Sequence, residues 1–387
     1  TISSTITAYT LGEKTVTTGG TTHITAVDNS SITSDAGGIA VALIKSSLIG
    51  GAISVGRSVS DNEITTVVQA YANQTTIVAT GNVVIEATSN PTINALAIGG
   101  SLAASTGAIG LAISGAGAIT ENDITSTTAA YTQAAHITLS AATSILANDT
   151  ATITADAGGV AVAIFKGDLG GGAVSVGAAT ADNDVISTLS AYADNSQITS
   201  SGNGIVRATS SPTIDAMAIA GAVSGAVAEA AGLALSGAGA ETDNDIIANT
   251  YAYISESDSE KTSTFTSSSG SITIEALNRA TITSDAGGVA VAASYGSGGA
   301  ASISVGAAIA RNDIGGATHA YVSNSEVTAN TNITIHADST AEIIALAFGA
   351  AVAIGAGEAS GAGAGAGAGA YNNIAMDLRA HATGSVV

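Results

Sequence analysis

The sequence contains no cysteine and no tryptophan, only two prolines and three phenylalanines, and few charged residues, which make up 10% of the chain. Without cysteine, a disulfide-held scaffold and a thiolate metal site are excluded. Nine residues are basic and 30 are acidic, giving a formal net charge of −21, so we expect no nucleic acid partner. What the sequence does hold is 46% hydrophobic residues, enough apolar surface to fold and to argue against intrinsic disorder.

Long apolar runs, such as residues 96–118, raise the question of membrane spans. They consist mostly of alanine and glycine, and several carry a charge, as at Lys45, Lys166 and Glu358, so we predict no membrane span. The sequence begins at Thr1 without a basic-then-apolar signal segment, and we expect a processed product or a piece of a longer polypeptide.

Internal repeats dominate the sequence. The segment at residues 32–41, ITSDAGGIAV, recurs with small changes at 153–162 and 282–291, and a related half-repeat occurs at 90–98 and 211–219. The repeating unit is therefore about 60 residues long. We expect one continuous domain, 1–387, with approximate units at 1–61, 62–121, 122–182, 183–243, 244–311 and 312–371 and a partial unit at 372–387.

Within a unit, alternating stretches such as residues 272–276, Ile-Thr-Ile-Glu-Ala, predict β-strands with one apolar face. The second half of each unit, for example 160–176, is mostly Ala, Gly and Val, and residues 361–370 alternate strictly between Gly and Ala. Sheets covered with such small side chains are expected to approach more closely than the usual ~10 Å. The fifth unit has about seven extra residues, which we place in a polar surface loop at 255–264.

These features predict an all-β fold, a repetitive parallel β-solenoid or β-helix with a small-residue core. A sandwich or barrel is less favoured because neither needs phase-locked repetition. The sequence does not choose between two coil lengths. Three coils of ~20 residues per unit predict a rod roughly 90 Å long, and two coils of ~30 predict roughly 60 Å, at ~4.8 Å per coil.

Two motifs, Gly81-Asn-Val-Val-Ile-Glu-Ala-Thr and Gly270-Ser-Ile-Thr-Ile-Glu-Ala, together with the repeat phase, carry a resemblance. The chain resembles the repeat regions of very large bacterial secreted adhesins of the filamentous-haemagglutinin and autotransporter type. The resemblance implies an extracellular parallel β-helix that acts as a stalk, an adhesin or a fibre.

An asparagine recurs in strict phase, and nine residues after it comes a tyrosine preceded by alanine, with His381 in the last tyrosine position. We expect a stack of buried, mutually hydrogen-bonded amides and an aromatic stack along one edge; the alternatives are a repeated polar site and a carbohydrate platform. The ladder residues are Asn62, Asn122, Asn183, Asn244, Asn312 and Asn372, with Tyr9, Tyr71, Tyr131, Tyr192, Tyr253 and Tyr321.

Acidic residues flank these asparagines. Alternating carboxylates are oxygen ligands suited to a hard cation, so Ca²⁺ is the one cofactor that the sequence suggests. Against it, the Gly-Gly-x-Gly-x-Asp signature of calcium β-rolls is missing, and a solvated acidic ridge explains the same pattern. The candidate ligands are Asp61, Glu63, Glu121, Asp123, Asp182, Asp184, Asp243, Asp245 and Asp313.

The five histidines have no metal-ligand spacing, and acids that recur with the repeat do not form a unique catalytic cluster, so we expect no enzyme. The predicted function is a non-catalytic extracellular structural protein, a rod- or filament-forming segment of a cell-surface fibre or adhesin stalk. The alternative is a surface-, glycan- or ice-binding adhesin module that uses Thr-x-Thr pairs, as at 152–154 and 281–283, although Asn94 and Asp215 interrupt that series. A calcium-dependent β-roll-like domain ranks below both.

Partners follow from the repeats. A solenoid without atypical capping repeats exposes strand edges, so we expect self-association end to end or laterally, and contact with a cell surface or its glycans. The expected location is extracellular or at the cell surface.

Overall fold

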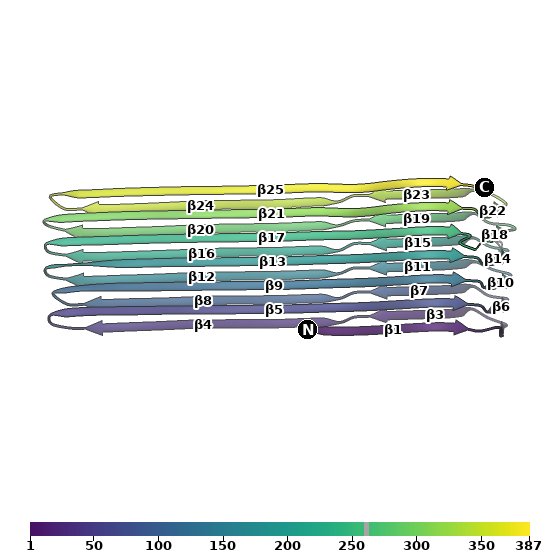
Figure 1. The fold of residues 1–387 in the computed structure, drawn as a ribbon, viewed down its shortest axis with the longest axis horizontal. Coiled ribbons are helices and arrows are strands. Elements are labelled where there is room, and N and C mark those ends of the chain that lie inside the picture. Colours follow the sequence, from purple (N-terminus) through teal and green to yellow (C-terminus); the bar gives the residue numbers. More distant parts are fainter. Residues whose placement is uncertain (259–262) are drawn as a thin grey trace.

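The computed structural model describes residues 1–258 and 263–387, and within these residues it is all β, with four parallel sheets, which we call A to D (Figure 1). The predicted parallel β-solenoid is confirmed. Sheet A holds β1 (Ile2–Leu11), β5 (Ile49–Asn73), β9 (Ile109–Gln133), β13 (Gly170–Asp194), β17 (Ala231–Ser255), β21 (Gly299–Ser323) and β25 (Ser360–Thr383).

The other three sheets supply the rest of each coil. Sheet B holds β2 (Thr15–Thr18), β6 (Thr76–Ala79), β10 (His136–Leu139), β14 (Gln197–Ser200), β18 (Thr264–Ser267) and β22 (Glu326–Ala329). Sheet C holds β3 (Thr22–Asp28), β7 (Val83–Ser89), β11 (Thr143–Asp149), β15 (Gly204–Ser210), β19 (Ile272–Asn278) and β23 (Ile333–Ser339). Sheet D holds β4 (Ser31–Lys45), β8 (Thr92–Thr106), β12 (Thr152–Gly167), β16 (Thr213–Ala228), β20 (Thr281–Gly296) and β24 (Glu342–Ala356).

One repeat unit makes one coil. Ile64, Ile124, Val185 and Ile246 lie side by side in register, 60, 61 and 61 residues apart. The predictions of two or three coils per unit, and of a rod 60 or 90 Å long, are therefore wrong. Seven strands at ~4.8 Å give a stack only about 30 Å high, whereas a 25-residue strand at ~3.3 Å per residue is about 80 Å long. The molecule is a wide slab (Figure 1).

The error has a physical cause. Isoleucines at 77, 85 and 93 recur every eight residues, but they lie on consecutive strands β6, β7 and β8 of one coil instead of on successive coils. The second half of the unit runs in two long strands of about 15 and 25 residues with one turn between them, and within each strand alanine and glycine leave no bulk that would force a corner.

In the fifth coil the offset rises to 68 residues, between Ile246 and Ile314. The extra residues lie between the end of β17 at Ser255 and the start of β18 at Thr264, and residues 259–262 of the predicted loop lie outside the described residues. The stacking register on both sides is kept.

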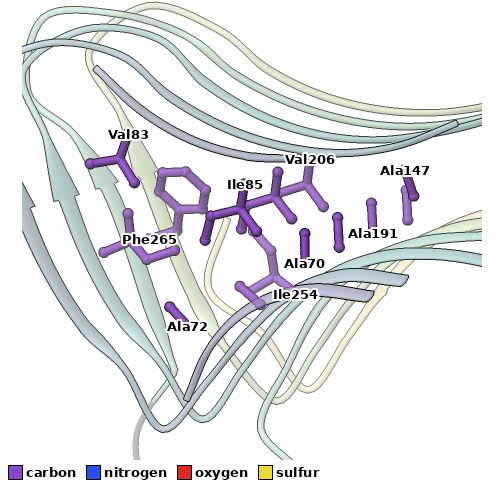
Figure 2. Close-up of a cluster of buried hydrophobic side chains, with 14 of the residues drawn as sticks. Ala70, Ala72, Val83, Ile85, Ala147, Ala191, Val206, Ile254 and Phe265 are labelled. Carbon is purple, nitrogen blue, oxygen red and sulfur yellow. The ribbon is translucent and has the colours of Figure 1, made fainter. Parts of the chain in front are cut away.

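The core is widest where sheets A, B and C enclose a triangular space. Figure 2 shows Val83, Ile85 and Phe265 filling its broad end, with Ala147 and Ala191 where the sheets converge. All five side chains are buried. Each coil puts Ile, Val or Phe where the sheets stand apart and alanine where they meet, so side-chain volume sets the shape of the cross-section.

Farther along, sheets A and D lie in backbone contact. A Cβ added to Gly177 of β13 would stand 2.2 Å from the carbonyl oxygen of Gly221 on β16, and one added to Gly159 of β12 would stand 2.0 Å from that of Ala178. Contacts this short leave no room for a side chain, as expected for sheets packed more closely than the usual ~10 Å. The small-residue composition is a steric requirement of this region.

Replacing Gly177 by valine tests this contact. We expect Gly177→Val to lower the free energy of unfolding by about 3 kcal/mol or more, because the two sheets must separate. Gly239→Val on β17 is the matched control: Gly239 faces solvent with nothing within 4 Å of an added Cβ, and valine favours strands, so stability should stay within about 0.5 kcal/mol. Chemical denaturation followed by circular dichroism gives both values, and equal losses would contradict the close packing.

Candidate functional site: three columns on sheet A

The strand alternation of sheet A separates the recurring residues onto two faces. Asn62 points into the solenoid, whereas Asp61, Glu63 and Tyr71 are an odd number of residues away and point outward. Because the strands are parallel and in register, each position repeats as a column across the sheet. The structure thus forms an inner amide column beneath two outer carboxylate columns, with a separate outer aromatic column.

The amide column is continuous over six coils. Nδ2 of each asparagine donates to Oδ1 of the next: Asn62 to Asn122 at 2.9 Å, then Asn122 to Asn183, Asn183 to Asn244, Asn244 to Asn312 and Asn312 to Asn372, each at 2.8 Å. The first four are at most 5% exposed. An amide carries both a donor and an acceptor, so identical residues stacked in register satisfy one another in an apolar interior.

The carboxylate columns stand on the opposite side of the same backbone. One runs through Asp61, Glu121, Asp182 and Asp243, and the other through Glu63, Asp123, Asp184, Asp245 and Asp313. The first column then receives Arg311 in place of an acid, and its guanidinium forms an ion pair with Glu241 and lies 4.0 Å from Asp243. The structure brings all nine candidate ligands together as two rows of like charge.

Burial and the close spacing of the carboxylates raise the pKa values of several aspartates in the two columns. Burial first, and then the neighbouring carboxylates of Asp182, Asp123, Asp245 and Asp243, raise the pKa of Asp184 to about 6. Burial and adjacent acids also raise the pKa values of Asp123, Asp182 and Asp245. Each carboxylate stacks on another at one strand spacing, ~4.8 Å, where like charges disfavour ionisation.

The rows do not converge on a point. Among residues 1–258 and 263–387, no group of three or more His, Asp or Glu side chains is placed to hold a metal ion. Regular in-plane rows differ from the wrapped oxygen cages that Ca²⁺ occupies in proteins. Calcium binding by these nine residues stays a prediction.

The aromatic column stacks as face-to-face rings. Successive ring centroids are 4.8 Å apart from Tyr71 through Tyr131, Tyr192 and Tyr253 to Tyr321. At the two ends of the column, Tyr9 lies 5.2 Å from Tyr71 and His381 lies 5.4 Å from Tyr321. Burial raises the pKa values of Tyr192 and Tyr253, so the phenols stay neutral. The rings lie on the solvent side of sheet A and bury one another, which fits an aromatic stack along one edge.

A buried carboxyl group at the end of sheet C was not anticipated. Asp149 of β11 is fully buried, accepts hydrogen bonds from the Ser126 hydroxyl and the Ala151 amide, and burial raises its pKa. Its column holds Asp28, Ser89, Ser210 and Asn278 in the other coils. In the sequence, the only sign of this column is a polar residue at the end of each seven-residue strand. A polar residue at that position is easily mistaken for part of a turn.

Threonines on the outer face of sheet D form a partial array. Thr92, Thr152, Thr213 and Thr281 stack in register, but the neighbouring column places Asn94 and Asp215 on either side of Thr154. Asn94 and Asp215, which interrupt the threonine series in the sequence, therefore also lie on the two strands directly beside Thr154.

A shallow groove of about 540 Å³ lies across the turn end of sheet A. It is lined by Leu111, Leu233 and glycines and alanines of β13, β17 and β21, without a titratable side chain. Such a lining offers neither acid nor base for catalysis.

Comparison with protein-family models, curated proteins and solved structures finds no significant match for this chain. The resemblance to adhesin repeats therefore stays a prediction. Within the described ranges, no helix is long and apolar enough to cross a membrane.

The amide column is tested by truncating it in the middle. Asn183→Ala leaves the Asn122 donor and the Asn244 acceptor without partners in the buried interior, and we expect the free energy of unfolding to fall by about 3 kcal/mol. Asn372→Ala leaves only one group, the Asn312 donor, without a partner, and it does so on the exposed last strand, where water can replace the lost amide, so it should cost at most about 1 kcal/mol. Urea unfolding of both variants gives the comparison. Equal losses in the free energy of unfolding would contradict the stabilisation of the interior by paired amides.

The carboxylate columns make stability depend on pH. The pKa of Asp184 is about 6 in the folded protein against 3.8 ordinarily, so the folded state binds the proton more tightly; the resulting stability is present in acid and is lost as pH rises through 6. We expect Asp184→Asn to raise the free energy of unfolding at pH 8 by roughly 1 kcal/mol, a value reduced for solvent screening, and to have little effect at pH 4. Asp168→Asn, in the exposed turn before β13, removes the same charge away from the columns and serves as control. An unchanged pH profile in Asp184→Asn would refute the crowding.

Proposed function

We propose that this chain is a non-catalytic structural segment of a cell-surface fibre, built as a wide β-ribbon. The observation that carries the proposal is the amide column, which links six coils by five equivalent hydrogen bonds of 2.8–2.9 Å. Each coil makes the same contacts with the next, so length is added by repetition without a new design for each step.

The repetition extends to the polar surface. Carboxylates, tyrosines and amides recur at fixed column positions, as expected when selection acts on the stack and not on one site. An enzyme needs a singular arrangement of acid, base and binding groups. The departures from the columns, such as Arg311, relieve repulsion between stacked acids, which is a structural role.

The dimensions refine the fibre hypothesis. A coil of about 61 residues adds only ~4.8 Å of height to a slab whose strands are about 80 Å long. Such a cross-section favours a broad ribbon or sheath over a slender stalk, because long reach would require a very long polypeptide. The charge of −21 suits a protein that must stay soluble outside the cell while displaying apolar strands.

Surface labelling tests the location and role together. Antibodies raised against the purified chain, applied to intact cells of the organism that makes it, should label external fibres or layers in electron microscopy. Permeabilised cells and pre-absorbed serum are the controls. Label that appears only after permeabilisation, or that never coincides with an extended structure, would refute the proposal.

A further inference from the structure

The outer face of sheet D is an extended apolar surface. Ile39, Val41 and Leu43 of β4 are 81%, 59% and 67% exposed, and Phe348 and Ile354 of β24 are each 55% exposed. The equivalent outward positions on the intervening strands hold Val, Ile, Leu, Ala or Gly. Monomeric proteins rarely expose contiguous apolar patches beyond a few hundred Å². This face therefore needs an occupant.

Two strands of this face carry opposite charges at a fixed distance. Asp35 and Asp156 stand in one column before the apolar positions, and Lys45 and Lys166 stand in another column ten residues later on the same strands. Asp285 continues the aspartate column but has Tyr295 in the lysine position, and Asp215 lies in the column two residues earlier. No ion pair within the described chain involves Asp35, Asp156, Lys45 or Lys166. A second copy turned end for end brings each aspartate column over a lysine column, whereas a copy with strands in the same direction opposes aspartate to aspartate.

Side-chain volumes follow the same symmetry. The end-for-end rotation that pairs residue 156 with 166 also pairs outward positions 158 with 164, where glycine meets isoleucine. In each of the first four coils this pair joins one glycine or alanine to one leucine or isoleucine: 37 with 43, 98 with 104, 158 with 164, and 219 with 225. The fifth and sixth coils depart from the rule, with two small residues at 287 and 293 and two large ones at 348 and 354.

We propose that the outer face of sheet D binds the same face of a second copy of this chain, through a two-fold axis parallel to the stacking direction. Strands of the two copies run antiparallel, coil faces coil, and Asp156 lies opposite Lys166 of the other copy. A two-fold axis makes the interface isologous, so the pairing closes at a dimer. The proposal does not depend on a cell-surface location.

The area is sufficient. Six strands at ~4.8 Å and 15 residues at ~3.3 Å give a face of about 1,400 Å² per partner, above the ~800 Å² per partner of a standard stable interface. The ribbons run straight and nearly parallel in Figure 1, and such flat sheets pack by stacking face to face.

Sedimentation of the full chain tests which face is used. We expect a dimer, and Val160→Glu should weaken it at least about 100-fold because two symmetric carboxylates are buried in the apolar centre. Val176→Glu is the matched control: both valines face outward in the same coil, 52% and 53% exposed, but Val176 is on sheet A, so the dimer should persist. A monomeric wild type at roughly 100 μM, where an interface of this area should be occupied, would overturn the proposal, as would assemblies that Val160→Glu leaves intact.

A cross-link tests the geometry independently of binding strength. The chain has no cysteine, so Asp156→Cys combined with Lys166→Cys places two thiols about 33 Å apart in one copy but about one sheet spacing, ~10 Å, apart across the dimer. A bismaleimide of about 10 Å reach should give a covalent dimer with the double variant and none with Lys166→Cys alone. Dimers from the single variant, or none from the double, would refute the two-fold arrangement.

Discussion

Stacking of each residue on its own equivalent in the next coil governs this molecule. Parallel, in-register strands place equivalent positions one strand spacing apart, so the main neighbours of a side chain are the equivalent side chains of the adjacent coils. Amides and flat aromatic rings are self-complementary and gain from such stacking, as Asn183 and Tyr192 do. Carboxylates repel one another, and this repulsion adds to burial in raising the pKa of Asp184. The same rule therefore produces columns whose members attract one another and columns whose members repel.

A second constraint is the distance between facing sheets. Where sheet B holds sheets A and C apart, Ile85 and Phe265 fill the space. Where nothing holds sheets A and D apart, backbone lies on backbone, and Gly177 marks the limit. Hydrophobic burial per residue is small in this flat part, so much of its cohesion comes from the ladder hydrogen bonds of very long strands, together with the amide column.

Fold class and the main columns were readable from the sequence because both are periodic. Recurrence of the segment at 32–41 predicts the solenoid, and the phase of Asn62 and Tyr71 predicts which residues stack. Coil length was not readable, since strand corners leave a weak trace: Ala134, with a φ of 50°, takes a left-handed conformation at a corner without the glycine that usually marks one. The neighbour of Arg311 follows from the same phase, since Arg311 precedes Asn312 as Asp243 precedes Asn244, whereas its ion pair with Glu241, two residues farther along the strand, depends on the side-chain conformation.

The seven-residue lengthening of the fifth coil shows where this architecture tolerates change. Between β17 and β18 the chain holds extra residues. The side-chain hydrogen bond across that step, from Asn244 to Asn312, is nevertheless 2.8 Å long, as in the two coils before it. Each coil has an equivalent corner. The corner thus works as a grafting point, and a peptide inserted there in successive coils would be displayed as a row of copies at one strand spacing, ~4.8 Å.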